Sequence, residues 1–412
     1  MVVSIENHNI HVVFLPYFTS SHLMPLIDAA LVFASRDGVK VSIITTPHNA
    51  AMFQSSVDKS ISSGHQIAIH SVKFPSEQVN LPEGIESFTT VTSPEQNSKV
   101  WQAIELIQKP MENLIRSLSP DCIFSDMCFP WTVDLALELN IPRLMFFASS
   151  FFYQCIEHTL KLYAPCNNMV ESGTETISIP GLPDNIKMKN SQLPDHISRT
   201  QFGAYFKVIV ESQTRSYGTV HDTFSELEPA YVDLYQKTIC KKSWHIGPLF
   251  HFSGRNEVQI SRKITSSHQH CLDWLDTQKP KSVVYVCFGS MVKFSDTQST
   301  EIFRALNASN QPFIFVTKTS ASLLGDFDEN KGSDVWNLLA DIKSPVIDKQ
   351  KIEEAVVRLM GGSGESEIIR QRAKEISVIA KHATEEGGSS YNDLSALIQD
   401  IRDLASKKKL WS

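Results

Sequence analysis

The 412-residue chain lacks several features that would each mark a particular class of protein. No run approaches the ~18–20 consecutive apolar residues that a membrane span requires. The net charge of −7 and the lack of a basic stripe argue against a nucleic-acid-binding surface. No basic region precedes the apolar run at Ile10, so the start of the chain does not resemble a signal peptide. We therefore expect a cytoplasmic protein, with two or three domains at ~100–200 residues each.

The chain also lacks the common metal and nucleotide motifs. Its seven cysteines form no close pairs, which favours free thiols in a reducing compartment over disulfides or a metal site. No G-x-G-x-x-G, P-loop or H-E-x-x-H motif is present. We accordingly expect no bound metal ion.

What the first half does contain is an alternation of apolar strands and amphipathic helices. The expected strands are Ile10–Phe14, Val41–Thr46, Gln66–Val72, Cys122–Phe124 and Arg143–Phe147. Apolar residues at helical spacing, as from Leu26 to Phe33, indicate helices between them. This alternation predicts an α/β domain with a doubly wound parallel sheet, covered by helices on both faces.

The later part of the first domain is less regular. Ile177–Pro194 is predicted to be an irregular excursion, and Phe202–Phe224 is predicted to be helical. Trp244–Leu249 is the expected last strand, and the polar stretch after it has the length of a linker. We therefore place the first domain at residues 1–250 and the linker at 251–270.

The second domain, expected at residues 271–380, shows only one β-α-β unit. Its strands end at Phe288 and Val316, and the alternation fails after Lys318. Two strands are fewer than an independently stable sheet needs, so this domain is predicted to be truncated. The last helix, residues 381–412, carries Ser390 and Asp393 at capping-box spacing and is expected to pack back on the first domain.

Two expected strand ends carry residues suited to acid–base chemistry. His22 follows the first strand, and Asp126 follows the apolar run that begins at Cys122. Parallel strands bring their carboxyl ends to one edge, where ligands bind in open α/β sheets. An imidazole there can take a proton from a hydroxyl, and a carboxylate can fix its tautomer. The plainer alternatives are a surface histidine and an aspartate that caps a helix from Pro130 onward.

A third candidate is Phe288-Gly289-Ser290, where a small residue and a hydroxyl follow a strand. Such a turn suits a phosphate group if a helix begins there. A tight turn with no ligand explains the tripeptide equally well.

Taken together, these segments resemble the plant family-1 UDP-sugar glycosyltransferases. The resemblance is carried by the sequence around His22, Asp126 and Ser290, and by Cys271–Leu275 and Glu385–Tyr391. It covers the chain as far as residue 318 and resumes near residue 342. Within the family, Phe14–Pro25 and Lys242–Pro248 look most like enzymes that add a sugar to soyasapogenol-type triterpene glucuronides.

The resemblance implies a GT-B-like fold of two doubly wound domains, and inverting transfer of a hexose from a UDP-sugar to a hydroxyl of a plant small molecule, with a triterpenoid or saponin favoured. His22 would be the general base and Asp126 its orienting partner. Gly289, Ser290 and Ser21 would lie near the donor. No cofactor is implied beyond the UDP-sugar co-substrate, and the chain is expected to be a monomer that binds an acceptor and a donor.

The chain departs from the family pattern in one place. The family's donor signature starts with Trp-Ala-Pro-Gln, passes through His-Cys-Gly-Trp-Asn-Ser and ends in a Glu/Asp-Gln pair, and none of it occurs between Lys318 and Ile342. Two hypotheses follow: a UDP-dependent glycosyltransferase, or a donor-less remnant that at most binds the acceptor. A binding module without chemistry is least favoured, because it would not need His22 and Asp126 as a pair.

Overall fold

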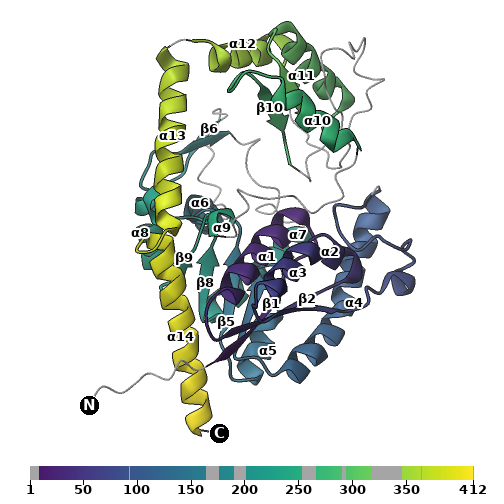
Figure 1. Cartoon of the computed structure of the whole chain (residues 1–412), viewed down its shortest axis with the longest axis vertical. Coiled ribbons are helices and arrows are strands. Elements are labelled where there is room, and N and C mark those ends of the chain that lie inside the picture. Colours follow the sequence, from purple (N-terminus) through teal and green to yellow (C-terminus); the bar gives the residue numbers. More distant parts are fainter. Residues whose placement is uncertain are drawn as a thin grey trace. The chain divides into compact units, whose positions relative to one another are not determined.

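The computed structural model divides the chain into two compact units, which we describe separately. The structure describes residues 9–91, 93–163, 176–189, 201–252, 266–289, 294–317, 346–362 and 364–411. The first unit comprises Met1–Glu86, Ser98–Gln259 and Val378–Ser412, and the second comprises Ser87–Asn97 and Ile260–Ser377. Figure 1 shows the elements of both.

A seven-stranded sheet in the order β3-β2-β1-β4-β5-β8-β9 forms the centre of the first unit. All neighbouring strands are parallel. The strands are β1 (Ile10–Leu15), β2 (Val39–Thr45), β3 (Ile67–Ser71), β4 (Cys122–Asp126), β5 (Arg143–Phe147), β8 (Gly218–His221) and β9 (Ser243–His245). The chain direction across the sheet reverses at β1, so the carboxyl ends of β1 and β4 flank a topological switch point.

Helices follow most of these strands. They are α1 (Ser20–Ala34), α2 (Pro47–Ala51), α3 (Gln54–Ser62), α4 (Pro94–Leu118), α5 (Thr132–Glu138), α6 (Phe151–Tyr163), α7 (Gln201–Arg215), α8 (Pro229–Thr238), α9 (Leu249–Phe252) and α14 (Ser389–Trp411), with short 3-10 turns at Ser76–Val79 and Ser225–Leu227. Within the described residues, no helix combines the length and the apolarity needed to cross a membrane.

Residues that alternate along the strands enter two separate cores. On one face, the rings of Phe14 and Phe124 stack with centroids 4.7 Å apart, and Phe33 of α1 packs edge-on against both. On the other face, Met145 of β5 packs with Phe206 of α7. The sheet is therefore covered on both sides, as the near-continuous apolar strands predict.

The last helix, α14, packs on the first unit although it ends the chain, and Figure 1 shows it in yellow beside the sheet. Five of its side chains are buried in the same core as β1 and α1: Leu394, Leu397, Ile398, Ile401 and Ala405. Apolar residues at helical spacing on one face of α14 thus complete a core built mainly from the other end of the chain.

The first turn of α14 corrects one prediction. The Ser390 hydroxyl donates to the carbonyl of Gly247 at 2.5 Å, and the Asp393 carboxylate accepts from the backbone N–H of His245 at 2.9 Å. The capping box predicted from their spacing is therefore wrong, because both side chains bind the segment at the end of β9. Both side chains do form hydrogen bonds, but their partners lie far away in the sequence and not in the first turn of α14.

Two further predictions in the middle of the chain were wrong. The segment expected to be irregular contains β6 (Thr176–Ser178), which pairs antiparallel with β7 (Lys187–Lys189). The helix expected over Phe202–Phe224 ends at Arg215, and strand β8 follows. All four residues of β8 are buried although two are polar, since Thr219 and His221 hydrogen-bond to each other at 3.2 Å. Such a strand carries no apolar signal in the sequence.

The described part of the second unit contains a two-stranded parallel sheet of β10 (Val284–Cys287) and β11 (Phe313–Val316). Its helices are α10 (Ser266–Asp276), α11 (Asp296–Ala308), α12 (Lys349–Met360) and most of α13 (Gly364–Thr384). Helix α10 begins inside the range expected to be a linker. Residues 318–345, where the sequence loses its alternation, lie outside the described residues, so the truncation and the domain limits stay predictions.

Candidate active site

His22 and Asp126 meet at the switch point of the first sheet. His22 lies in the first turn of α1, directly after β1, and Asp126 is the last residue of β4. Leu15 of β1 pairs with Ser125 of β4, so the register places both strand ends at one edge. The Nδ1 atom of His22 lies 2.9 Å from the Oδ2 atom of Asp126. Two residues 104 positions apart in the sequence thus form one hydrogen-bonded pair.

The Asp126 side chain is held from several directions. Its Oδ1 atom accepts a hydrogen bond from the backbone N–H of Cys128 at 2.8 Å, and the residue is 1% exposed. The buried guanidinium of Arg143 donates to the backbone carbonyl of Asp126 at 3.3 Å and to the Ser125 hydroxyl at 2.9 Å. Asp126 does not cap α5, whose N-cap is Trp131. The local geometry is a turn closed by an aspartate side chain.

This pair sets the protonation of the imidazole. Attraction to Asp126 raises the pKa of His22 above 6.5, against the opposing effect of burial. The carboxylate accepts from Nδ1–H, which leaves the lone pair of neutral His22 on Nε2. The side chain is 32% exposed, so a substrate hydroxyl has access to the ring.

We expect the substitution Asp126→Asn to lower the pKa of His22 below 6.5, because burial then remains without the opposing charge. In the native protein the pair stabilises the fold fully below pH 6.5, and this contribution is lost as the pH rises through the raised pKa. An NMR titration of the His22 ring, assigned with a His22→Gln variant, measures both values. An unchanged pKa in the Asp126→Asn variant would contradict the coupling.

Aromatic side chains surround the pair, and sequence reasoning missed them. The Tyr17 ring lies 5.9 Å from the His22 ring between centroids, and 5.3 Å from that of Phe129. The Tyr205 hydroxyl donates to the carbonyl of Cys128 at 2.6 Å. Burial raises the pKa of Tyr17 well above its ordinary value, so its phenol stays neutral. Tyr17 is 4% exposed and Phe129 is 1% exposed, so these rings belong to the buried core beside the pair.

One potential metal-ligand set occurs among the described residues, and its chemistry does not favour a metal ion. Donor atoms of His22, Asp126 and Cys128 lie within 4.8 Å of one another. The Nδ1 atom of His22 already bonds to Asp126. Burial raises the pKa of the Cys128 thiol well above its ordinary value, whereas metals bind the thiolate. The set therefore fits an acid–base pair better than a metal centre.

The residues expected near the donor are more scattered. Ser21 is exposed in the first turn of α1, next to His22. Gly289 belongs to the second unit, where it follows β10 with φ +78° and has open space around the position of a side chain. A φ in this range favours glycine. Ser290 lies outside the described residues.

Comparison with known proteins decides the family. No family model matches the chain. Solanidine UDP-glucose glucosyltransferase 1 of Solanum tuberosum is 42% identical, over 98% of this chain and 99% of that protein. The chain belongs to the plant UDP-glycosyltransferases. Soyasapogenol B glucuronide galactosyltransferase of Glycine max, another member of this family of enzymes, is 33% identical over 96% of each chain.

A solved structure supports the same assignment. A glycosyltransferase of Glycyrrhiza uralensis, crystallised with glycyrrhetinic acid 3-O-monoglucuronide, is 31% identical to this glycosyltransferase. The two share a TM-score of 0.88 over 97% of each chain. The α/β, GT-B-like fold class predicted from the sequence is thereby confirmed. The alignment with the Solanum protein extends over 488 residues, whereas this chain contains 412.

Proposed function

We propose that this chain transfers a hexose from a UDP-sugar to a hydroxyl group of a plant small molecule, with inversion at the anomeric carbon. The observation that carries the proposal is the 2.9 Å hydrogen bond between His22 and Asp126 at the switch point of the sheet. It leaves a basic nitrogen on a partly exposed ring at the edge where such sheets bind ligands.

The proposed step is a direct displacement. Nε2 of His22 takes the proton of the acceptor hydroxyl while its oxygen forms a bond to the anomeric carbon. The bond from that carbon to the UDP oxygen breaks, and its electron pair leaves on the diphosphate. Asp126 stabilises the imidazolium that forms. A single displacement inverts the configuration of the carbon. Ser21, Gly289 and Ser290 are the proposed donor-side residues.

We further infer that the acceptor is a steroidal or triterpenoid compound. Relatives named for solanidine, nuatigenin and soyasapogenol B glucuronide support this class.

A second candidate function has its own observation. The donor signature is missing after Lys318, and the longer alignment with the Solanum protein is consistent with a deleted segment. In this case the chain binds the acceptor without transferring a sugar, because the groups that hold the uracil, diphosphate and hexose are gone.

Isothermal titration of the folded chain with UDP-glucose and UDP-galactose separates the two. We expect micromolar binding of one donor if the chain is a working transferase, followed by product formation with a saponin acceptor. A chain that is folded by circular dichroism, binds a saponin and binds neither donor would contradict transfer and support the second function.

The six cysteines in the described part of the chain are free. The cytoplasmic location and the monomeric state both stay predictions.

A further inference from the structure

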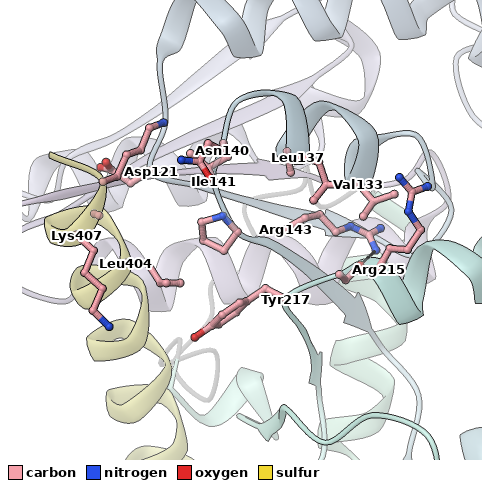
Figure 2. A pocket seen from close by; sticks show the side chains of 15 residues that line it. Asp121, Val133, Leu137, Asn140, Ile141, Arg143, Arg215, Tyr217, Leu404 and Lys407 are labelled. Atoms are coloured by element: carbon pink, nitrogen blue, oxygen red, sulfur yellow. Dashed lines mark hydrogen bonds between the residues drawn. The ribbon is translucent and has the colours of Figure 1, made fainter. Parts of the chain in front are cut away.

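A cavity of about 600 Å³ lies at the opposite edge of the first sheet from His22. Asp121, Arg143 and Tyr217, at the amino ends of β4, β5 and β8, line it, and Leu137 and Leu404 contribute from α5 and α14 (Figure 2). Asp126 ends the strand that starts beside this cavity, four residues and about 13 Å further along. A molecule bound here would therefore leave the proposed acceptor and donor sites free.

The walls of the cavity are largely apolar. Val133, Leu137 and Ile141 form one side, and Leu404 of α14 faces them. Leu137 is 57% exposed. Lys408 of α14 donates to the carbonyl of Leu139 at 2.8 Å and so fixes the helix against the turn after α5. The cavity is thus a defined space of the size that binds small molecules.

The side chains that line the cavity carry a net positive charge, although the net charge of the whole chain is −7. The lining includes four cationic side chains, Arg143, Arg215, Lys407 and Lys408, and one carboxylate, Asp121. Asp121 already accepts from the backbone N–H of His11 at 2.8 Å. Arg215 pairs with Asp134 at 2.5 Å. An excess of positive charge therefore remains for an anion.

Three of these cations, Arg143, Lys407 and Lys408, have no carboxylate hydrogen-bond partner in the part of the chain that the structure describes; Lys408 donates to the Leu139 carbonyl. Lys407 is exposed and forms no ion pair there. Arg143 is 2% exposed, and its guanidinium donates only to neutral oxygens, those of Ser125, Thr132, Ser216 and the Asp126 backbone. Burial lowers the pKa of Arg143 to about 9, against the opposing attraction of Asp126. An anion nearby would offset part of the cost of burying this charge.

We propose that this cavity is a second ligand site, which binds a carboxylate carried on an apolar body. The carboxylate lies within reach of the Lys407 ammonium group and in the field of Arg143. The apolar body lies against Leu137, Ile141 and Leu404. A flexible fatty acid and a planar aromatic acid share this chemistry, so the experiment includes a probe for each.

The test is calorimetric titration of the full chain with decanoate, below its micelle concentration, and with cinnamate. We expect saturable binding of at least one of the two. Tighter binding of decanoate would indicate a fatty acid as the ligand, and tighter binding of cinnamate would indicate an aromatic acid. Lys407→Gln should weaken it about threefold to tenfold through the lost charge interaction. Leu137→Ser should weaken it about fivefold to thirtyfold through lost apolar contact. Both side chains are exposed, so neither change removes core packing.

Two controls accompany these variants. Lys237→Gln removes an exposed lysine of α8 that does not line the cavity, and it should bind like the native chain. Decanol keeps the chain and removes the charge, and it should bind more weakly and without salt dependence. The proposal is overturned if neither carboxylate binds saturably, if decanol binds as tightly as decanoate, or if either cavity variant binds like the native chain.

Discussion

Replacing His22 by alanine is expected to lower the rate of sugar transfer by about 10²–10⁴, the usual contribution of a positioned general base. The imidazole is partly exposed and is hydrogen-bonded to a buried carboxylate. Without it, the acceptor hydroxyl must attack with its proton in place. Initial rates of UDP release with a saponin acceptor measure the loss, and the affinity for the donor should stay unchanged.

The matched control is His48→Ala, which removes an exposed histidine of α2. It should transfer sugar at the native rate. Because the pKa of His22 is raised, transfer by the native chain should also increase with pH until the ring is neutral. If the His22→Ala variant retained the native rate while His48→Ala did the same, the general base would have to be sought elsewhere.

Replacing Leu397 by alanine is expected to destabilise the first unit by about 2–5 kcal/mol, the range for a buried leucine. Leu397 is fully buried in the core that β1 and α1 share with α14. The cavity left behind would lie between the last helix and the sheet. Chemical denaturation followed by circular dichroism gives the change in the free energy of unfolding.

Ser395→Ala is the control for this substitution. Ser395 lies on the exposed face of the same helix, and its hydroxyl only bonds back to the carbonyl of Tyr391. We expect a change within about 0.5 kcal/mol, as for most surface positions. Equal effects of the two substitutions would mean that α14 contributes little to the stability of the first unit, contrary to its packing.

Several elements could be predicted because the relevant signal is local. The five strands predicted from apolar segments correspond to β1 to β5, with limits shifted by a few residues. They could be predicted because a parallel strand that is buried on both faces is apolar throughout. Strand β8 could not be found this way, because Thr219 and His221 satisfy each other inside the core. The roles of Ser390 and Asp393 could not be predicted for a related reason: their partners, Gly247 and His245, are distant in the sequence.

For the candidate site, too, the local features could be predicted from the sequence and the long-range contacts could not. The sequence alone determined the α/β class, the family resemblance, the position of His22 and Asp126 at strand ends, and the lack of the donor signature, because each is written in local composition or motif. Only the tertiary structure decided that the two side chains lie 2.9 Å apart, that Arg143 and Cys128 hold the aspartate, and that α14 closes a cationic cavity at the far edge of the sheet. These features depend on strand order and register, which arise when distant segments bury their apolar faces together, and no single stretch of sequence encodes them.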